Sequence, residues 1–298
     1  MNLVFGRFAF YLKPYVEKFL KSNYKELNLK ISNFSDGEIF VEGKDKVFNE
    51  DVYFIQTFPR YKVNEALMET FIVLDALKRG NAKSIYLILP YYPYARQDRK
   101  INPLDPISSS LVASLLEASG ANVVVTLDLH APQIAGNFNI PCFEYSALEV
   151  FADYLKEKID KDFVVVAPDA GAAKRARKFA KLLGELPVVI IDKYRPKPNI
   201  SEVTAIFGEV ENKNCILIDD MIDTAGTITN AAKFLKDKGA KDIYICATHG
   251  VFSGKAKERI ENVLKEKIVK EVIVTNSLPQ EIESLTILDI VPILFNGV

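Results

Sequence analysis

Eight short apolar runs, separated by segments with helical periodicity, constrain the fold of this chain more than any other feature. Each run is almost continuous in apolar side chains, which is typical of strands buried on both faces. The runs are Val52–Thr57, Ile85–Pro90, Val123–Leu127, Val164–Ala167, Val188–Ile191, Cys215–Ile218, Ile243–Thr248 and Val272–Thr275. Strands of this kind that alternate with amphipathic helices form a parallel sheet covered on both faces. The sequence therefore predicts an α/β protein.

Two strand–helix–strand units resemble each other along their whole length. In each, a strand leads through a loop to a helix, a glycine and a second strand. The first unit comprises Val52–Gln56, Glu65–Arg79, Gly80 and Ile85–Leu89, and the second comprises Cys215–Asp219, Ile228–Lys238, Gly239 and Ile243–Ala247. We expect both glycines to be left-handed helix caps. All βαβ units look somewhat alike, but a match over the whole unit favours two related domains that meet at a cleft.

The repeat places a domain boundary near residue 143. We expect an N-terminal domain over residues 1–143 and a C-terminal domain over residues 144–298, with room for the last residues to pack back on the first domain. Arg195–Asn199 (RPKPN) has two prolines among basic residues and is expected to be an exposed loop, not a linker.

Charge and hydropathy argue against several classes of protein. The 298 residues contain 38 Lys and Arg against 39 Asp and Glu, so bulk charge does not favour nucleic acid or anionic lipid as a partner. No apolar run has the length of a membrane span, and the first residues lack a signal-peptide pattern. Cys142, Cys215 and Cys246 form no metal-binding pattern and fit buried thiols. We expect a soluble cytoplasmic protein.

The segment LIDDMIDTAGT (Leu217–Thr227) carries the most specific chemistry. A buried strand ends in two acids, and the chain then turns into a helix; the residues concerned are Asp219, Asp220, Asp223, Thr224, Ala225, Gly226 and Thr227. Backbone N–H groups at a helix N-terminus, together with threonine hydroxyls, form an anion site at the carboxyl end of a strand. The two acids would repel a phosphate, so they either accept hydrogen bonds from sugar hydroxyls or hold Mg²⁺.

Helix capping is the structural alternative for this segment, because Asp and Thr cap helices in most α/β proteins. Two adjacent acids that close a buried strand are costly for capping alone, so we favour a binding site. Gly226 permits a backbone conformation or a close approach that a side chain would block.

Other strand ends also carry polar residues. Both histidines follow strands; we expect a structural role for His249, whereas His130 could bind a metal. Asp169 closes a strand and either caps the next helix or precedes a loop that holds pyrophosphate. Lys193 and Arg195 begin a proline-containing loop that could close over a transferring phosphoryl group.

Two further segments are less specific on their own. In YYPYARQDRK, Arg96 and Gln97 could clamp a polyphosphate and hydrogen-bond a nucleotide, although most such clusters are solvated basic loops. Phe34–Glu38 (FSDGE) is by itself a surface turn, with Asp36 and Gly37 as the turn pair.

Taken together, these strings resemble the ribose-phosphate pyrophosphokinase (phosphoribosyl pyrophosphate synthase) family. The resemblance extends over nearly the whole chain and rests on FSDGE, YPYARQD, DLHAPQIAG, PDAGAAKR, IDKYRPKPN, DDMIDTAGT, THGVFSG and VTNSLPQE, in that order. It implies two tandem phosphoribosyltransferase-like domains. The implied reaction is transfer of the β,γ-diphosphoryl group of Mg-ATP to the 1-hydroxyl of ribose 5-phosphate, which gives phosphoribosyl pyrophosphate and AMP. Mg²⁺ is the implied cofactor.

The resemblance also implies roles for individual residues. Lys193 and Arg195 match the flexible catalytic loop, and His130 and Asp169 match the Mg²⁺ site. ATP binding is implied for Phe34, Asp36, Gly37, Glu38, Arg96 and Gln97. Ribose 5-phosphate binding is implied for Arg195, Asp219, Asp220, Asp223, Thr224, Ala225, Gly226 and Thr227. In the family, a neighbouring subunit supplies the adenine-side turn, so a homo-oligomer is expected. No residue stands out as a general base, and Asp220 is only a candidate.

Three features depart from the family pattern. Ala172 stands where many members have a second glycine, Ile101–Leu104 is less basic than in many relatives, and the chain stops at Val298. We therefore expect weak or absent allosteric inhibition by ADP.

Three other functions are less consistent with the sequence, and nucleic-acid binding, the first of them, has little support from charge. A phosphoribosyltransferase would also fit DDMIDTAGT, but it needs neither a duplicated domain nor the loop at Lys193. A non-catalytic, synthase-associated regulatory paralogue would be expected to lose catalytic cations or metal ligands, and both kinds of residue remain here.

Overall fold

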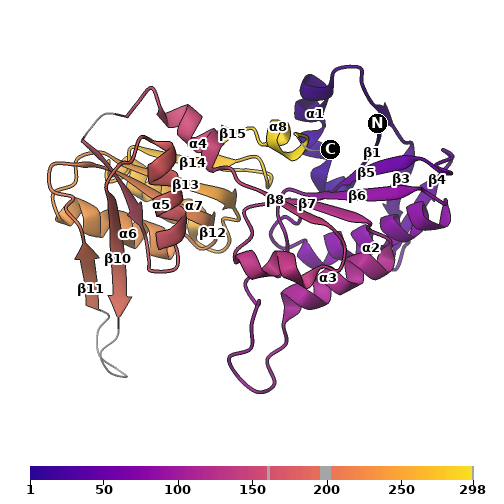
Figure 1. The fold of residues 1–298 in the computed structure, drawn as a ribbon, viewed down its shortest axis with the longest axis horizontal. Helices are drawn as coiled ribbons and strands as arrows, with labels where there is room; N and C mark the ends of the chain where they lie inside the picture. The colour runs from indigo at the N-terminus through magenta and orange to yellow at the C-terminus, as the bar shows by residue number, and fades with distance from the viewer. Residues whose placement is uncertain (160–161, 195–202, 297–298) are drawn as a thin grey trace. The chain divides into compact units, whose positions relative to one another are not determined.

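The computed structural model describes residues 1–159, 162–194 and 203–296 (Figure 1). The chain divides into two compact units. Unit 1 comprises Met1–Ser146, Ser277–Pro279 and Asp289–Val298, and unit 2 comprises Ala147–Asn276 and Gln280–Leu288. Each unit is described by itself below. The domain boundary near residue 143 stays a prediction.

Unit 1 is built on a parallel sheet. Its six strands, within the described residues, are ordered β2-β1-β5-β6-β7-β8, and every neighbouring pair is parallel. The strands are β1 (Asn2–Phe5), β2 (Lys25–Glu26), β5 (Asp51–Ile55), β6 (Ser84–Leu89), β7 (Val123–Leu127) and β8 (Cys142–Tyr145). The apolar side chains of β5, β6 and β7 are mostly buried, which is why these three runs were recognisable in the sequence.

Helices cover this sheet. They are η1 (Arg7–Leu12), α1 (Lys13–Leu20), α2 (Val63–Arg79), α3 (Ser108–Ser119), η2 (Pro132–Asn137) and α8 (Val291–Leu294). Helices α2 and α3 lie side by side (Figure 1). Helix α8, near the end of the sequence, lies beside α1, where the ring centroids of Phe19 and Phe295 are 6.3 Å apart. Chain segments that are distant in sequence therefore complete one unit.

A separate two-stranded hairpin belongs to unit 1. Strands β3 (Leu29–Asn33) and β4 (Ile39–Gly43) pair antiparallel, with Leu29 opposite Gly43 and Asn33 opposite Ile39. No side chain of either strand is buried, and β4 lies against α2. The hairpin therefore presents the Phe34–Glu38 turn at its exposed end.

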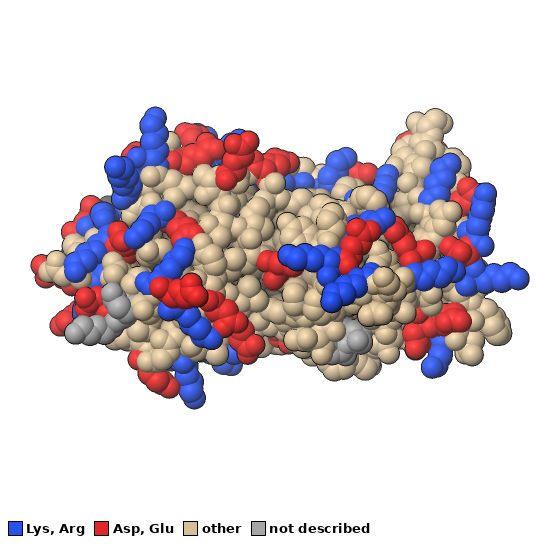
Figure 2. Space-filling model, turned by 90° about the horizontal axis from the view of Figure 1, so that it is seen from above, with Lys and Arg blue, Asp and Glu red and all other residues tan. Residues whose placement is uncertain are grey.

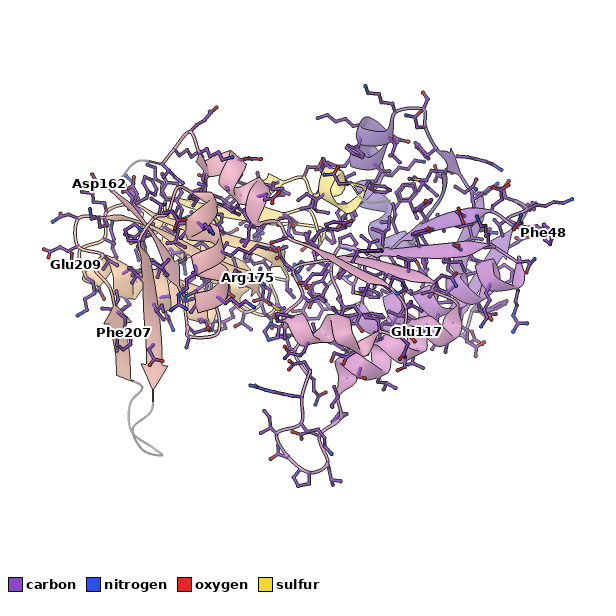
Figure 3. All side chains as sticks on the ribbon, viewed as in Figure 1. Phe48, Glu117, Asp162, Arg175, Phe207 and Glu209 are labelled. Atoms are coloured by element: carbon purple, nitrogen blue, oxygen red, sulfur yellow. The ribbon has the colours of Figure 1, made fainter. Side chains whose placement is uncertain are left out.

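Unit 2 contains a larger sheet. Within the described residues it has seven strands in the order β11-β10-β9-β12-β13-β14-β15, all parallel except the antiparallel pair β10 and β11. The strands are β9 (Phe163–Ala167), β10 (Val188–Tyr194), β11 (Val203–Phe207), β12 (Asn214–Ile222), β13 (Ile243–Gly250), β14 (Glu271–Thr275) and β15 (Thr286–Leu288). All side chains of β9 and β13 are buried, as expected for central strands. Phe207, on the edge strand β11, is 61% exposed (Figure 3).

The helices of unit 2 are α4 (Leu148–Leu155), α5 (Ala173–Leu182), α6 (Gly226–Asp237) and α7 (Ala256–Lys265). Their apolar sides pack on the sheet; Ile228, Leu235, Ile260 and Val263 belong to one buried cluster with β12 and β13. The predicted α/β fold is confirmed, and all eight apolar runs are strands.

The repeated units have the same strand pairing. Val52 of β5 lies opposite Ile85 of β6, and Cys215 of β12 lies opposite Ile243 of β13. The expectation of two left-handed glycine caps is wrong for Gly80, which has a φ of −67°.

Close packing explains the glycine at position 80. The left-handed conformation falls on Asn81, with a φ of 59°, whereas Gly239 has the expected positive φ of 83°. A Cβ on Gly80 would lie 2.7 Å from Cγ2 of the buried Val47. Position 80 therefore requires glycine because a side chain would clash with Val47, and not because the backbone needs a positive φ there.

The surface carries both charges. On the face shown in Figure 2, Lys and Arg side chains are interspersed with Asp and Glu, in keeping with a net charge of −1. In the described part of the chain, no helix combines the length and the apolar character that a membrane crossing requires.

Candidate phosphate-binding site

Three neighbouring strands of unit 2 bring polar residues to one edge of the sheet. Strands β10, β9 and β12 are adjacent and parallel, so their carboxyl ends lie together. Lys193 is in β10, Asp169 follows β9, and Asp219 and Asp220 are in β12. The side chain of Lys193 and all of Arg195 lie outside the described residues. Ligands of open α/β sheets bind at such an edge.

Strand β12 does not end at the two acids, as the sequence suggested, but continues to Ile222. Asp219 lies opposite Ala247, and Met221 lies opposite His249, because β13 also continues past the predicted end. The longer strand holds the acids on a rigid element. It also explains His249, which is buried within β13 and fits the structural role expected for it.

Asp219 lies in a region of concentrated negative charge. Burial raises the pKa of its carboxyl well above the usual range, and repulsion from Asp220 and Asp169 raises this pKa further. The backbone N–H of Asp220 donates to Oδ1 of Asp219 at 2.9 Å, which opposes the rise without cancelling it. A site with several acids and a raised carboxyl pKa is a functional candidate, because such a cluster destabilises the folded chain.

The loop after these acids leaves a helix N-terminus without a side-chain cap. Ala225 is the N-cap residue of α6, and this position makes no side-chain cap hydrogen bond. The N-cap residue is therefore neither the Asp nor the Thr that the capping alternative expected. The hydroxyl-bearing residues Thr224 and Thr227 are exposed beside the helix start. Uncapped N–H groups and free-standing hydroxyls at one point suit a bound phosphate.

The special backbone conformation in this loop belongs to Ala225 and not to Gly226. Ala225 has a φ of 61°, in the left-handed region. Gly226 instead permits a close approach, because a Cβ there would lie 3.2 Å from Nη1 of Arg259. Of the two roles weighed for Gly226 from the sequence, the structure supports close approach.

A second segment, to which the sequence analysis assigned no role at this loop, supports it. The Ser253 backbone N–H donates to the Asp223 carbonyl at 3.0 Å, and the Ser253 hydroxyl hydrogen-bonds to the Asp223 carboxylate. Nη1 of Arg259, in α7, donates to the Thr224 carbonyl at 2.7 Å. Ser253 lies in THGVFSG, so the motif was visible, but Arg259 lies in an ordinary helical pattern. Its guanidinium places a positive charge beside the start of α6.

Asp169 has a local structural role. Its Oδ1 accepts a hydrogen bond from the Ala172 backbone N–H at 3.0 Å, which fixes the turn into α5. A Cβ on Gly171 would lie 3.1 Å from that same oxygen, so glycine allows the carboxylate to fold over the turn. Arg175, labelled in Figure 3, lies in the first turns of α5. The turn-capping alternative for Asp169 is thus supported.

In unit 1, the nucleotide candidates follow the adjacent strands β6 and β7. Arg96 and Gln97 are exposed in the loop after β6. The Gln97 carbonyl accepts from the Ser109 backbone N–H at 3.2 Å, and the Gln97 side chain hydrogen-bonds to the Ser108 hydroxyl, so the loop is held to the start of α3. His130 is exposed after β7.

The Phe34–Glu38 turn closes the β3–β4 hairpin as predicted. Gly37 has a φ of 98°, which favours glycine, and the Glu38 N–H donates to Asp36 Oδ1 at 3.0 Å. The Phe34 side chain is 53% exposed, with its ring centroid 5.0 Å from that of Phe40. The turn therefore presents a partly exposed aromatic ring on a defined backbone.

The described residues contain no group of three His, Cys, Asp or Glu side chains that could hold a metal ion. His130 lies in unit 1 and Asp169 in unit 2, and each is described within its own unit. The Mg²⁺ site stays a prediction.

A parallel sheet with a strand-to-helix loop at its carboxyl edge is typical of α/β proteins that bind nucleotides and other phosphate-bearing ligands. Comparisons with known proteins narrow this class. A family model described as the N-terminal domain of ribose phosphate pyrophosphokinase matches residues 2–120, and one described as a phosphoribosyl synthetase-associated domain matches residues 185–294. The chain belongs to the ribose-phosphate pyrophosphokinase family.

Individual relatives agree with this assignment. The ribose-phosphate pyrophosphokinase of Bacillus caldolyticus is 50% identical over 272 residues, covering 90% of this chain and 84% of that protein. That of Fusobacterium nucleatum is 50% identical over 275 residues, covering 90% and 85%. The crystal structure of phosphoribosylpyrophosphate synthetase from Mycobacterium smegmatis superposes with a TM-score of 0.91 at 42% identity, covering 99% of this chain and 96% of that one. The predicted family and its enzyme class, the diphosphotransferases, are confirmed.

Proposed function

We propose that this chain transfers the β,γ-diphosphoryl group of ATP to the 1-hydroxyl of ribose 5-phosphate. The observation that carries the proposal is the uncapped α6 N-terminus directly after the acids of β12, in a chain that is half identical to named ribose-phosphate pyrophosphokinases. Ribose 5-phosphate would place its phosphate against Thr224, Thr227 and the first N–H groups of α6. Its ring hydroxyls would then reach Asp219 and Asp220.

The chemistry requires alignment and charge neutralisation more than covalent help from the protein. The anomeric oxygen attacks the β-phosphorus of ATP, the bond from that phosphorus to the bridging α,β-oxygen breaks, and AMP leaves. Lys193 and Arg195 would neutralise the moving diphosphoryl group, and Asp220 is the candidate acceptor for the hydroxyl proton. The ATP side would be bound by Arg96, Gln97 and the Phe34–Glu38 turn.

Mg²⁺ is part of the proposal. In phosphoryl-transfer sites it usually keeps several waters and binds through one or two carboxylates together with substrate phosphates. The donor set fits this mode, because Asp169 adds negative charge at Asp219 and has a second carboxylate oxygen beyond the one that holds the Ala172 N–H. Asp169 would hold the ion, which when bound neutralises phosphate charge; His130 is a further ligand that the family resemblance implies.

Assembly and location complete the proposal. A homo-oligomer would let the exposed Phe34–Glu38 turn contact adenine bound to a neighbouring subunit. A cytoplasmic location suits the free thiols of the buried Cys215 and Cys246, since a reducing compartment keeps such thiols reduced.

Phosphorus NMR of the purified protein with Mg²⁺, ATP and ribose 5-phosphate tests the reaction. The expected products are AMP and a sugar-linked diphosphate. Formation of ADP would indicate transfer of a single phosphoryl group, and ATP that stays intact would favour a regulatory paralogue. A double variant, Thr224→Val with Thr227→Val, keeps the side-chain volumes but removes both hydroxyls. It should form no product at low concentrations of ribose 5-phosphate.

A further inference from the structure

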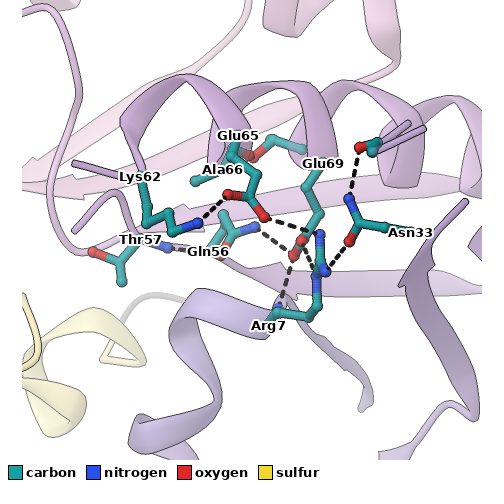
Figure 4. Close-up of polar contacts among 10 residues, drawn as sticks. Arg7, Asn33, Gln56, Thr57, Lys62, Glu65, Ala66 and Glu69 are labelled. Carbon is teal, nitrogen blue, oxygen red and sulfur yellow. Dashed lines mark hydrogen bonds and ion pairs between the residues drawn. The ribbon is translucent and has the colours of Figure 1, made fainter. Parts of the chain in front are cut away.

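A fully buried carboxylate in unit 1 fixes the position of an arginine. Glu69, in α2, has no exposed side-chain surface and accepts three hydrogen bonds: from the Arg7 backbone N–H at 2.7 Å, from Arg7 Nε at 2.6 Å and from Gln56 Nε2 at 3.0 Å (Figure 4). A buried charge is tolerated only when it is paired and hydrogen-bonded in this way. The guanidinium of Arg7 is therefore held in one place.

The same guanidinium reaches the β3–β4 hairpin. Arg7 Nη1 donates to Asn33 Oδ1 at 2.5 Å, and Asn33 Nδ2 donates to the Gly37 carbonyl at 2.7 Å (Figure 4). Asn33 is the last residue of β3, directly before the Phe34–Glu38 turn. A continuous chain of hydrogen bonds thus joins Glu69 in α2 to the backbone of the turn. We call Glu69, Arg7 and Asn33 the hairpin relay.

Burial of side chains contributes little to the position of the turn. A two-stranded hairpin is marginally stable by itself, and β3 and β4 contain no buried side chain. The turn residues from Phe34 to Glu38 are all exposed. The hairpin relay acts at the base of this turn. There the Asn33 side-chain amide accepts from Arg7 and donates to Gly37, and these two bonds set the orientation of the turn relative to α2.

We propose that Arg7 and Asn33 are positioning residues for ATP binding, because they hold the Phe34–Glu38 turn in its adenine-binding orientation. This inference rests on the proposed function, in which that turn contacts adenine. Asn33 suits the role because its side chain both accepts from Arg7 and donates to Gly37. Neither residue was identified from the sequence, since they are 26 positions apart and share no pattern.

Asn33→Ala removes both bonds at an exposed position, so unit 1 should still fold. We expect KM for ATP to rise about tenfold, as for the loss of one to two ordinary hydrogen bonds, while kcat and KM for ribose 5-phosphate stay within about twofold. Asn33→Asp keeps an acceptor for Arg7 but loses the donor to Gly37, and we expect it to raise KM for ATP as Asn33→Ala does. Lys30→Ala, at an exposed position of the same strand, is the matched control and should leave all three constants unchanged.

Phe34→Ala separates failure of the relay from failure of the proposed function. If wild-type protein forms no phosphoribosyl pyrophosphate, the proposed function fails. If Phe34→Ala raises KM for ATP but Asn33→Ala matches Lys30→Ala, the turn binds ATP and the relay is overturned. If neither Phe34→Ala nor Asn33→Ala raises KM for ATP, the turn has no part in ATP binding and the inference is wrong at its premise. A rise in both substrates' KM values would indicate general damage and would also overturn it.

Discussion

Replacing Glu69 by alanine should destabilise unit 1 by about 3 kcal/mol. The carboxylate of this residue is fully buried and accepts three hydrogen bonds of 2.6 to 3.0 Å. Its removal leaves two donors unsatisfied, the part-buried Arg7 backbone N–H and the buried Gln56 amide; an unsatisfied buried donor costs about 1–3 kcal/mol. The Arg7 side chain is 31% exposed and can turn to water, which keeps the loss at the lower end of the range for broken buried pairs, about 3–5 kcal/mol.

Hydrogen exchange on the full-length protein measures this change within one unit. About 3 kcal/mol corresponds to protection factors on the order of a hundredfold lower for the amides of β5 and α2. Glu69→Gln, which keeps the volume and one acceptor, should lose less. Protection in β13 of unit 2 is the internal control. If Glu69→Ala lowers protection in β5 and α2 by less than threefold, the reasoning about this buried carboxylate is refuted.

Three other perturbations have defined outcomes. Asp219→Asn should stabilise the ligand-free protein at pH 7, because burial and neighbouring acids make the charged carboxylate of Asp219 costly in the folded state. The free energy of unfolding of the wild type should rise as pH falls through the raised pKa of Asp219, by at most about 1.4 kcal/mol per pH unit. Thermal melts of the variant should lack this pH dependence. Arg259→Met should raise KM for ribose 5-phosphate about tenfold and leave KM for ATP unchanged in steady-state assays, whereas equal changes in both would contradict a role at the loop. Gly80→Ala should cost about 1–3 kcal/mol in denaturant titrations by crowding Val47, and Val47→Ala should recover part of that loss; additive effects of the two changes would disprove the contact.

Much of the fold could be predicted because central parallel strands need continuous apolar runs. β9 and β13 are wholly buried and were found for that reason. β8 was missed because only partly buried and exposed residues form it, so its sequence has no apolar run. The true end of β12 was missed because the acids at 219 and 220 looked like a strand end, whereas pairing with β13 continues to Ile222.

The candidate site was also predictable from the sequence only in part. The loop from Asp223 to Thr227 was recognisable because its residue types and their order are themselves the chemical signal. Arg259, Arg7 and Glu69 were not, since each acts on a loop far from it in sequence. Asn33 adjoins its turn, but nothing local distinguishes it from other polar positions. The left-handed conformation was wrongly assigned to Gly80 because the sequence shows the glycine but not the close packing of Val47 against it.

The central claim is that a diphosphoryl group, and not a single phosphoryl group, moves to the sugar. ATP labelled with ³²P separately at the β and at the γ position tests this most directly, with ribose 5-phosphate and Mg²⁺ present. The account predicts that both labels appear in the sugar product in equal amounts and that unlabelled AMP is released. Appearance of the γ label alone in the sugar product, with the β label left in ADP, would contradict it.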